Sequence, residues 1–134
     1  MSALLNNRVW TSELNLIEFR TNANSMCRVD PLLGRVIEAL GSNATARMLD
    51  CDRSQVSRWN TGTEAISQEM GRRIVDLHDV LTRILRVYEP EMAALWLSGS
   101  EPLLGGARPI DVMTIEGAAP VIRAIDGISQ GAFA

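Results

Sequence analysis

The chain has 134 residues, 46% of them hydrophobic, and a formal net charge of −3 at pH 7. A chain of this size and apolar content can bury a core without disulfide or metal staples, which excludes wholesale disorder. It contains no run of 18 apolar residues and no signal-peptide pattern at its start. We therefore expect a cytoplasmic protein with no membrane-spanning helix.

The charges are unevenly placed along the chain. All 13 basic residues are arginine. Residues 28–86 hold nine arginines and eight acids, whereas residues 87–134 hold two arginines and six acids. The acidity therefore lies in the last third, and a contact with nucleic acid would have to come from the middle of the chain.

The sequence offers few residues for metal or catalytic chemistry. Cys27 and Cys51 are far apart, and His78, the one histidine, lies on a predicted helix. A structural zinc site takes about four ligands, which these residues do not supply. No Ser/His/Asp set or glycine-rich phosphate loop is present either. We expect no enzyme activity, no metal and no cofactor, with His78 at the surface or at the edge of the core.

The first helices follow from their end signals. Residues 1–27 are weakly patterned and predict an N-terminal arm with at most one short helix. Asp30 and the proline after it begin the first clear helix, which Gly41 ends. Ser42 or Asn43 is then expected to cap a second helix.

Residues 42–62 match the demands of a helix-turn-helix. Ala46 is small where the two helices would cross, and Asp50 stands in the turn where glycine is usual, because its short side chain tolerates positive φ. Asp52 caps a further helix at about residues 53–60. The apolar residues expected to wedge the two helices together are Leu49, Cys51, Val56 and Trp59.

The second helix of this motif would present polar side chains to a DNA groove. Arginine pairs with guanine edges, glutamine pairs with adenine edges, and a helix N-terminus binds phosphate. The predicted DNA-binding residues are Asn43, Arg53, Ser54, Gln55, Ser57 and Arg58. An ordinary helical hairpin with solvated polar faces is the alternative. One monomer offers few phosphate contacts, so we expect a homodimer that reads two half-sites.

The rest of the chain also reads as helices. Ser67 caps a helix of about 20 residues, whose apolar seam consists of Met70, Ile74, Leu77, Leu81, Ile84 and Tyr88. Pro90 stops it, and a short helix at about residues 91–97 follows. Residues 98–109 form a loop, Pro109 opens a helix that Gly117 closes, and Pro120 opens a last helix. No period-2 pattern is sustained, so the predicted fold class is all-α.

Two segments of the chain resemble a known family. CDRSQVSRWNTG, residues 51–62, resembles the Xre (Cro/C1-like) helix-turn-helix, although Asp50 departs from its usual glycine. WLSGSEPLLGGARPIDVMTIEGAAPVIRAIDGISQG, residues 96–131, resembles the toxin-binding domain of Xre/MbcA/ParS-type antitoxins. The shared pattern runs through Trp96-Leu97, Pro102, Leu104-Gly105-Gly106, Pro109, Thr114, Gly117, Val121, Ile125, Ile128 and Gly131.

The resemblance implies three parts and a function. Residues 1–27 are the arm, residues 28–66 the Xre-like helix-turn-helix, and residues 67–134 a long helix with a small helical toxin-binding domain. Members of the family are antitoxins that block the active site of a RES-domain toxin, which degrades NAD or ADP-ribosylates proteins. Their helix-turn-helix commonly represses their own operon, often as a dimer.

The expected toxin-binding residues lie in the loop and at the C-terminus: Leu103, Leu104, Gly105, Gly106, Arg108, Ile128, Gln130, Gly131, Phe133 and Ala134. Paired glycines let backbone approach another surface closely. The alternatives are that the leucines fold back on the core and that the terminus is frayed. Two other functions stay open: a stand-alone helix-turn-helix regulator that dimerises through the C-terminal domain, and an adaptor that no longer binds DNA.

Overall fold

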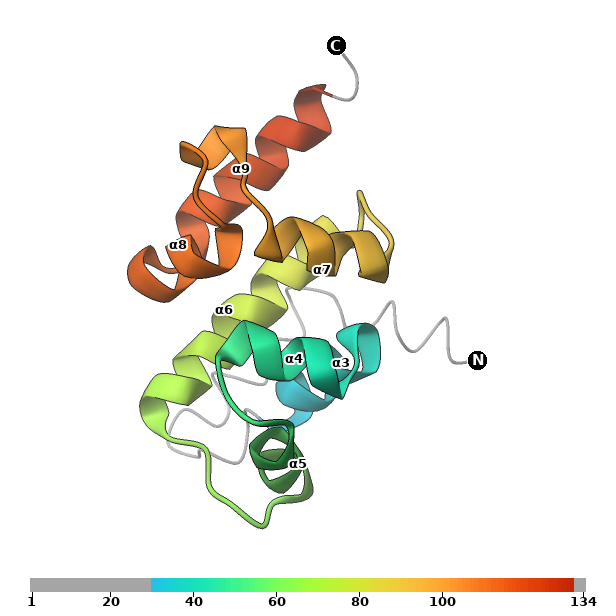
Figure 1. Ribbon diagram of the computed structural model, residues 1–134, viewed down its shortest axis with the longest axis vertical. Helices are drawn as coiled ribbons and strands as arrows, with labels where there is room; N and C mark the ends of the chain where they lie inside the picture. Colours follow the sequence, from blue (N-terminus) through green and yellow to red (C-terminus); the bar gives the residue numbers. More distant parts are fainter. Residues whose placement is uncertain (1–29, 132–134) are drawn as a thin grey trace.

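The computed structural model describes residues 30–131, so the predicted arm at residues 1–27 lies outside the described residues. The described part consists of seven α-helices and one short 3-10 helix, with no strand (Figure 1). The predicted all-α fold class is therefore confirmed. The helices are α3 (Asp30–Leu40), α4 (Ser42–Leu49), α5 (Arg53–Thr61), α6 (Gln68–Ile84), α7 (Pro90–Ser98), η2 (Pro102–Leu104), α8 (Pro109–Glu116) and α9 (Ala118–Gly131).

Helix α6 lies at the centre of the packing. It contacts α3 and α4 from the first part of the chain and α8 and α9 from the last part. Figure 1 shows α3, α4 and α5 toward one end of the molecule and α9 toward the other. The predicted seam is confirmed, because Ile74, Leu77, Leu81 and Ile84 are buried in one continuous core while Met70 and Tyr88 pack at its edge.

His78 lies in the core, with 1% of its surface exposed, so its expected place at the surface or core edge is wrong. The physical reason is that α6 has neighbours on two sides, α3 and α9. A helix covered on two sides buries more than the single stripe that one seam predicts. Thr82 donates its hydroxyl to the carbonyl of His78 at 2.8 Å, which keeps this polar turn of the helix inside.

Helix α6 ends at Ile84, one turn earlier than predicted. The amides of Val87 and Tyr88 both donate to the carbonyl of Ile84, so the chain closes in turns while Tyr88 still packs on the core. Glu89 is extended, with φ −66° and ψ 159°, as expected for a residue that precedes proline. Pro90 then occupies the first turn of α7 and begins this helix as well as ending the segment before it.

Gly41 alone separates α3 from α4, which corrects the predicted caps. Neither Ser42 nor Asn43 caps α4; Gly41 holds the cap position with φ 86° and ψ 161°, and no side chain caps the helix there. This conformation is essentially restricted to glycine. The hydroxyl of Thr45 donates to the carbonyl of Gly41 at 2.7 Å.

The turn between α4 and α5 follows its prediction. Asp50 has φ 54° and ψ 54°, and it is the one non-glycine residue with positive φ among residues 30–131. The amide of Cys51 donates to the carbonyl of Ala46 at 3.0 Å across this turn. Asp52 holds the cap position of α5, although its side chain makes no capping hydrogen bond.

The last two helices begin close to their predicted starts. Pro109 lies in the first turn of α8, and Gly117 follows its end, as expected. Helix α9 begins at Ala118, before Pro120. A proline fits there because the first amides of a helix have no partner within the helix.

Trp59 offers a direct test of this core. It is 4% exposed and belongs to the core cluster. We expect Trp59→Ala to lower the free energy of unfolding by about 3–5 kcal/mol, because it leaves a large cavity. Urea denaturation measures the change. The control Ile115→Ala removes a side chain that is 82% exposed and should stay within about 0.5 kcal/mol of the parent protein; equal losses from the two changes would contradict this core.

Candidate functional site

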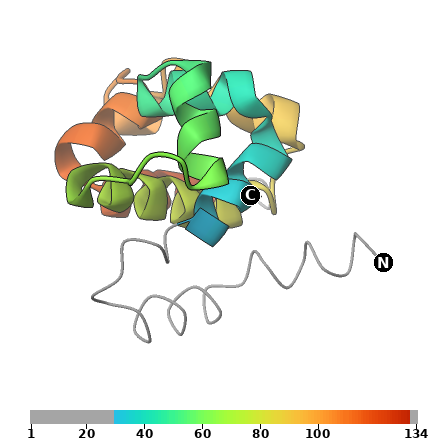
Figure 2. The ribbon, with the colours of Figure 1, turned by 90° about the horizontal axis from the view of Figure 1, so that it is seen from below.

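Helix α5 presents a polar face to solvent. Val56 and Trp59 are buried beneath it, whereas the predicted DNA-contacting side chains are exposed, except for half-buried Gln55. Asn43, at the start of α4, is also exposed. Figure 2 views the molecule from the end at which α5 lies. The sequence therefore predicted the outward face of α5 correctly.

Glu64 organises this face, and the sequence reasoning missed it. Its carboxylate accepts hydrogen bonds from Nε2 of Gln55 at 3.0 Å, Nε of Arg58 at 2.9 Å and Nε1 of Trp59 at 3.0 Å. Two of the predicted DNA-contacting side chains are thus tied to one acid that follows the helix. The signal available in the sequence was an acid five residues after a buried tryptophan, whose indole N–H needs a hydrogen-bond acceptor.

The same contacts set the acidity of Glu64. The hydrogen bond from Arg58, followed by the one from Gln55, lowers the pKa of the Glu64 carboxyl below its ordinary value. Glu64 therefore stays ionised throughout the neutral range. Its charge offsets that of Arg58, which leaves Arg53 as the exposed arginine of α5 that no ion pair with a described residue neutralises.

A second tryptophan–glutamate pair orders the segment between α7 and α8. Nε1 of Trp96 donates to Oε2 of Glu101 at 2.7 Å, and the amide of Leu103 donates to Oε1 of the same carboxylate at 3.0 Å. Backbone bonds from Leu104 and Gly106 to the carbonyl of Glu101 close the turn. Glu101 is only 8% exposed, so the predicted loop is a fixed 3-10 turn rather than a loose connection.

This turn holds one leucine outward and one inward. Leu104 is half-buried against the core, while Leu103 is 57% exposed. Gly105 and Gly106 follow with φ 67° and 87°, the left-handed conformation that glycine allows at little cost. Each of the two alternatives for the leucines therefore applies to one residue: Leu104 folds back onto the core, and Leu103 remains accessible to a partner.

Leu103 lies against α9. A Cβ atom on Gly127 would come within 3.1 Å of Cδ1 of Leu103, so the glycine leaves room for this leucine. The structure thereby brings the η2 turn next to the last helix, where Ile128 is half-buried and Gln130 and Gly131 are exposed. Phe133 and Ala134 lie outside the described residues.

Arg108 has an internal partner. Its Nε and Nη2 donate to the two carboxylate oxygens of Asp111 at 2.7 and 2.9 Å, at the start of α8. This bidentate bond raises the pKa of Arg108 and lowers that of Asp111. Both residues line a hollow of about 530 Å³ that also contains Arg47, Arg73 and Ile115. Ile115 is 82% exposed, an apolar surface residue that the sequence reasoning did not select.

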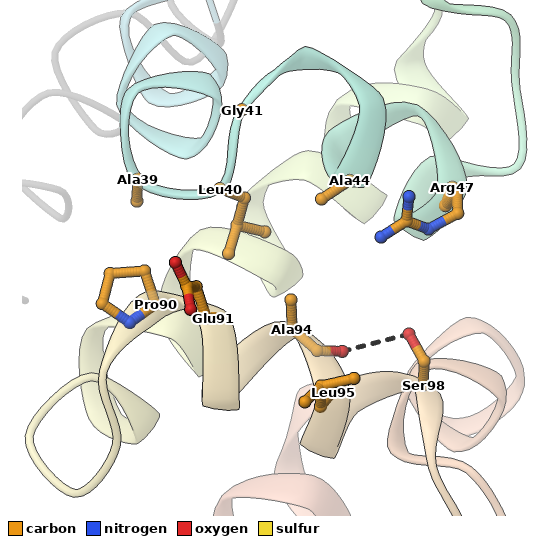
Figure 3. Close-up of a pocket in the computed structure, with 10 residues that line it drawn as sticks. All are labelled: Ala39, Leu40, Gly41, Ala44, Arg47, Pro90, Glu91, Ala94, Leu95 and Ser98. Carbon is orange, nitrogen blue, oxygen red and sulfur yellow. Dashed lines mark hydrogen bonds between the residues drawn. The ribbon is translucent and has the colours of Figure 1, made fainter.

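A larger groove, of about 810 Å³, separates α7 from α3 and α4 (Figure 3). Its walls are mainly apolar and include Leu40, Ala44 and Leu95, and the last of these is 66% exposed. Arg47 and Glu91 lie toward opposite ends of the groove in Figure 3. No ion pair with a described residue engages either of these two charges.

The predicted DNA-binding residues and the predicted toxin-binding residues occupy different regions of the molecule. Helix α5 and the C-terminal end of α9 lie at opposite ends of the molecule (Figure 1). Residues 30–131 contain no group of three or more metal-ligating side chains. None of the helices in this part of the chain is long and apolar enough to cross a membrane.

Comparisons with known proteins find a sequence relative of this chain. A curated relative named Prs ADP-ribosylating antitoxin, from Sphingobium sp. (strain YBL2), is 31% identical over 97 residues, which are 64% of this chain and 61% of the relative. The chain thus matches about three fifths of that relative's length. No protein-family model matches the chain.

A solved structure shares the fold. One chain of the crystal structure of the M. tuberculosis MbcT–MbcA toxin–antitoxin complex matches with a TM-score of 0.63 and 22% identity, covering 78% of this chain and 96% of that chain. The sequence relative confirms the predicted resemblance to antitoxins, and the solved structure shows a shared fold.

Glu64 gives the candidate site a measurable pH dependence. Because its pKa is lower in the folded protein, its contacts stabilise the fold above the unfolded-state pKa of about 4.3 and lose this effect as pH falls through the folded value. We expect Glu64→Gln to be less stable than the parent protein at pH 7. Urea denaturation between pH 3 and pH 7 should show that this difference shrinks in acid, and a difference independent of pH would contradict the assignment.

Proposed function

We propose that the chain is an antitoxin of a type II toxin–antitoxin system that binds a RES-domain toxin and blocks its active site. It acts by binding and not by catalysis, and its partner degrades NAD or ADP-ribosylates proteins. The curated relative carries the name of an ADP-ribosylating antitoxin, and the fold matches a chain of a toxin–antitoxin complex. We assign residues 67–134 to toxin binding and residues 28–66 to DNA binding in the cytoplasm.

The observation that carries this proposal is the exposed Leu103 on its fixed turn. An apolar side chain held in solvent costs free energy in the free protein, which a partner recovers by covering it. The turn is already ordered by Glu101, so binding requires little further ordering of the backbone. Gly105 and Gly106, both exposed, allow a partner's surface to approach the backbone closely.

Charge supports the same partner. Residues 87–134 hold six acids and two arginines, and one of these arginines, Arg108, is already paired with Asp111. A toxin that handles the anionic dinucleotide NAD is expected to have a basic pocket. An acidic surface speeds the encounter with such a pocket, because complementary charge raises association rates.

A charge at Leu103 tests the toxin-binding surface. We expect Leu103→Glu to weaken binding to the purified toxin at least about tenfold, because the carboxylate must be desolvated in the complex. Isothermal titration calorimetry measures this change. The matched control is Met92→Glu, which places the same charge at an apolar side chain of similar exposure, 51%, and should leave the affinity within about threefold, a difference under 1 kcal/mol. Equal losses from both changes would contradict the assignment.

We further propose that α4 and α5 form a helix-turn-helix that represses the chain's own operon. The turn at Asp50 and the exposed polar face of α5 support this role. The exposed guanidinium of Arg53 and the N-terminus of α4 at Asn43 are available for phosphate contacts. A DNA-binding regulator without a toxin partner remains the second candidate, and a neighbouring gene for a RES-domain protein favours the antitoxin.

Removing the arginines of α5 tests the DNA contact. We expect the double change Arg53→Ala and Arg58→Ala to abolish specific binding to the upstream DNA of the operon at physiological salt, because two cationic contacts are lost. Gel shifts measure the binding, and toxin affinity should stay unchanged. The control Arg123→Ala removes an exposed arginine from α9 and should bind DNA normally. Normal gel shifts by the double variant would remove these arginines from the site.

We also propose a homodimer in which the groove between α7 and the α3–α4 pair receives the same region of a second copy. In a two-fold dimer, Arg47 of one copy lies opposite Glu91 of the other, and the contact occurs twice. These charges lie toward opposite ends of the groove (Figure 3), and its apolar wall, including Leu95, supplies surface for burial. Because the groove carries opposite charges toward its two ends and an apolar wall between them, we favour a second copy of the chain as its occupant over an unrelated helix.

Exchanging the two charges tests this pairing. We expect Arg47→Glu to convert the dimer into a monomer, because like charges then meet twice. Adding Glu91→Arg to the same chain should restore the dimer. Light scattering coupled to gel filtration measures the mass. A monomeric parent protein, or a dimer that survives Arg47→Glu, would contradict the interface.

A further inference from the structure

Glu64 has a geometry that stability alone does not explain. It lies in the segment between α5 and α6, on neither helix. An exposed ion pair such as Arg58–Glu64 contributes little to folding. Yet three different donors from α5 converge on this single carboxylate. One of them, Trp59, is buried in the core, so the carboxylate has a fixed anchor beneath the two surface side chains.

The three contacts leave available the atoms of Arg58 and Gln55 that would form hydrogen bonds with DNA bases. Among the described contacts, Arg58 uses Nε toward Glu64, and the two terminal nitrogens keep their donors. These are the donors that pair with O6 and N7 of guanine. Glu64 therefore holds the inner edge of the guanidinium and leaves its outer edge free.

Gln55 has the same arrangement. Its amide nitrogen carries two hydrogens, and one donates to Glu64. The second hydrogen and the amide oxygen form the donor–acceptor pair that matches adenine N7 and N6. The bond to Glu64 also decides which way the amide faces, which an isolated glutamine leaves undecided.

We propose that Glu64 is a positioning residue for sequence reading, holding Gln55 and Arg58 in the orientation in which α5 presents them to base edges. This inference rests on the proposed DNA-binding function. Glutamine and arginine lose much rotamer freedom when they bind. A carboxylate that orders them beforehand reduces this loss at matched base pairs, so Glu64 contributes to discrimination between sequences.

The charge of Glu64 lowers the affinity for DNA in general, although its positioning of the side chains raises the preference for the correct sequence. An ionised carboxylate next to α5 repels phosphates of every sequence. Its removal should therefore strengthen binding to any DNA while it weakens the preference for the correct sequence. This opposition separates positioning from simple structural support, because a merely unfolded or loosened helix would lose affinity for all DNA together.

The experiment compares two duplexes by fluorescence anisotropy: the DNA upstream of the chain's own operon, and a scrambled duplex of equal length and composition. We expect Glu64→Gln to lower the ratio of the two affinities about tenfold, within the range of one bidentate base contact. The matched control is Glu69→Gln, which removes the same charge from an exposed acid in the first turn of α6. This control should change both affinities equally and keep the ratio.

A second variant guards against loss of fold. Glu64→Asp keeps the charge, but its shorter side chain does not reach all three donors. It should lower the ratio without raising affinity for scrambled DNA, and circular dichroism confirms that each variant is folded. If the parent protein discriminates and both Glu64 variants keep its ratio, the inference is wrong while the DNA-binding function stands. If the parent protein itself does not discriminate, the DNA-binding proposal fails and the inference fails with it.

Discussion

The rest of the structure depends on the packing of α6 against two sets of helices. Its buried residues Ile74, Leu77, Leu81 and Ile84 belong to one core, which α3 reaches from the first part of the chain and α9 from the last. The two candidate binding surfaces therefore share a single hydrophobic core. A change that loosens α6 is expected to affect both surfaces together, whereas changes of exposed side chains on α5 or at η2 act on one surface alone.

Each surface is connected to that core by a tryptophan. Trp59 donates to Glu64, and Trp96 donates to Glu101, in each case to a carboxylate five residues later. The indole body, buried in Trp59 and half-buried in Trp96, supplies apolar contact, while its N–H fixes an acid that then orders polar groups closer to the surface. Glu64 orders side chains on α5, and Glu101 orders the backbone of the η2 turn. The same tryptophan–glutamate hydrogen bond thus supports two different candidate functions.

The helices and most of their ends could be predicted from the sequence, because capping residues, prolines and apolar spacing are local signals. Gly41, Asp50, Gly62 and Gly117 all end or flank helices where expected. The contacts of Glu64 and the burial of His78 could not be predicted, since they depend on which elements meet in space. The loop at residues 98–109 was recognised as important, but its rigidity follows from the carboxylate of Glu101, whose partners are set by tertiary structure.

The central claim is that this chain binds and silences a toxin encoded beside it. The most direct measurement is co-expression with the product of the neighbouring gene, followed by the mass of the purified species and the NAD content of the cells. We expect one stable complex that contains both proteins, with cellular NAD or the target protein protected only when this chain is present. Separate elution of the two proteins, together with unchanged toxicity, would contradict it.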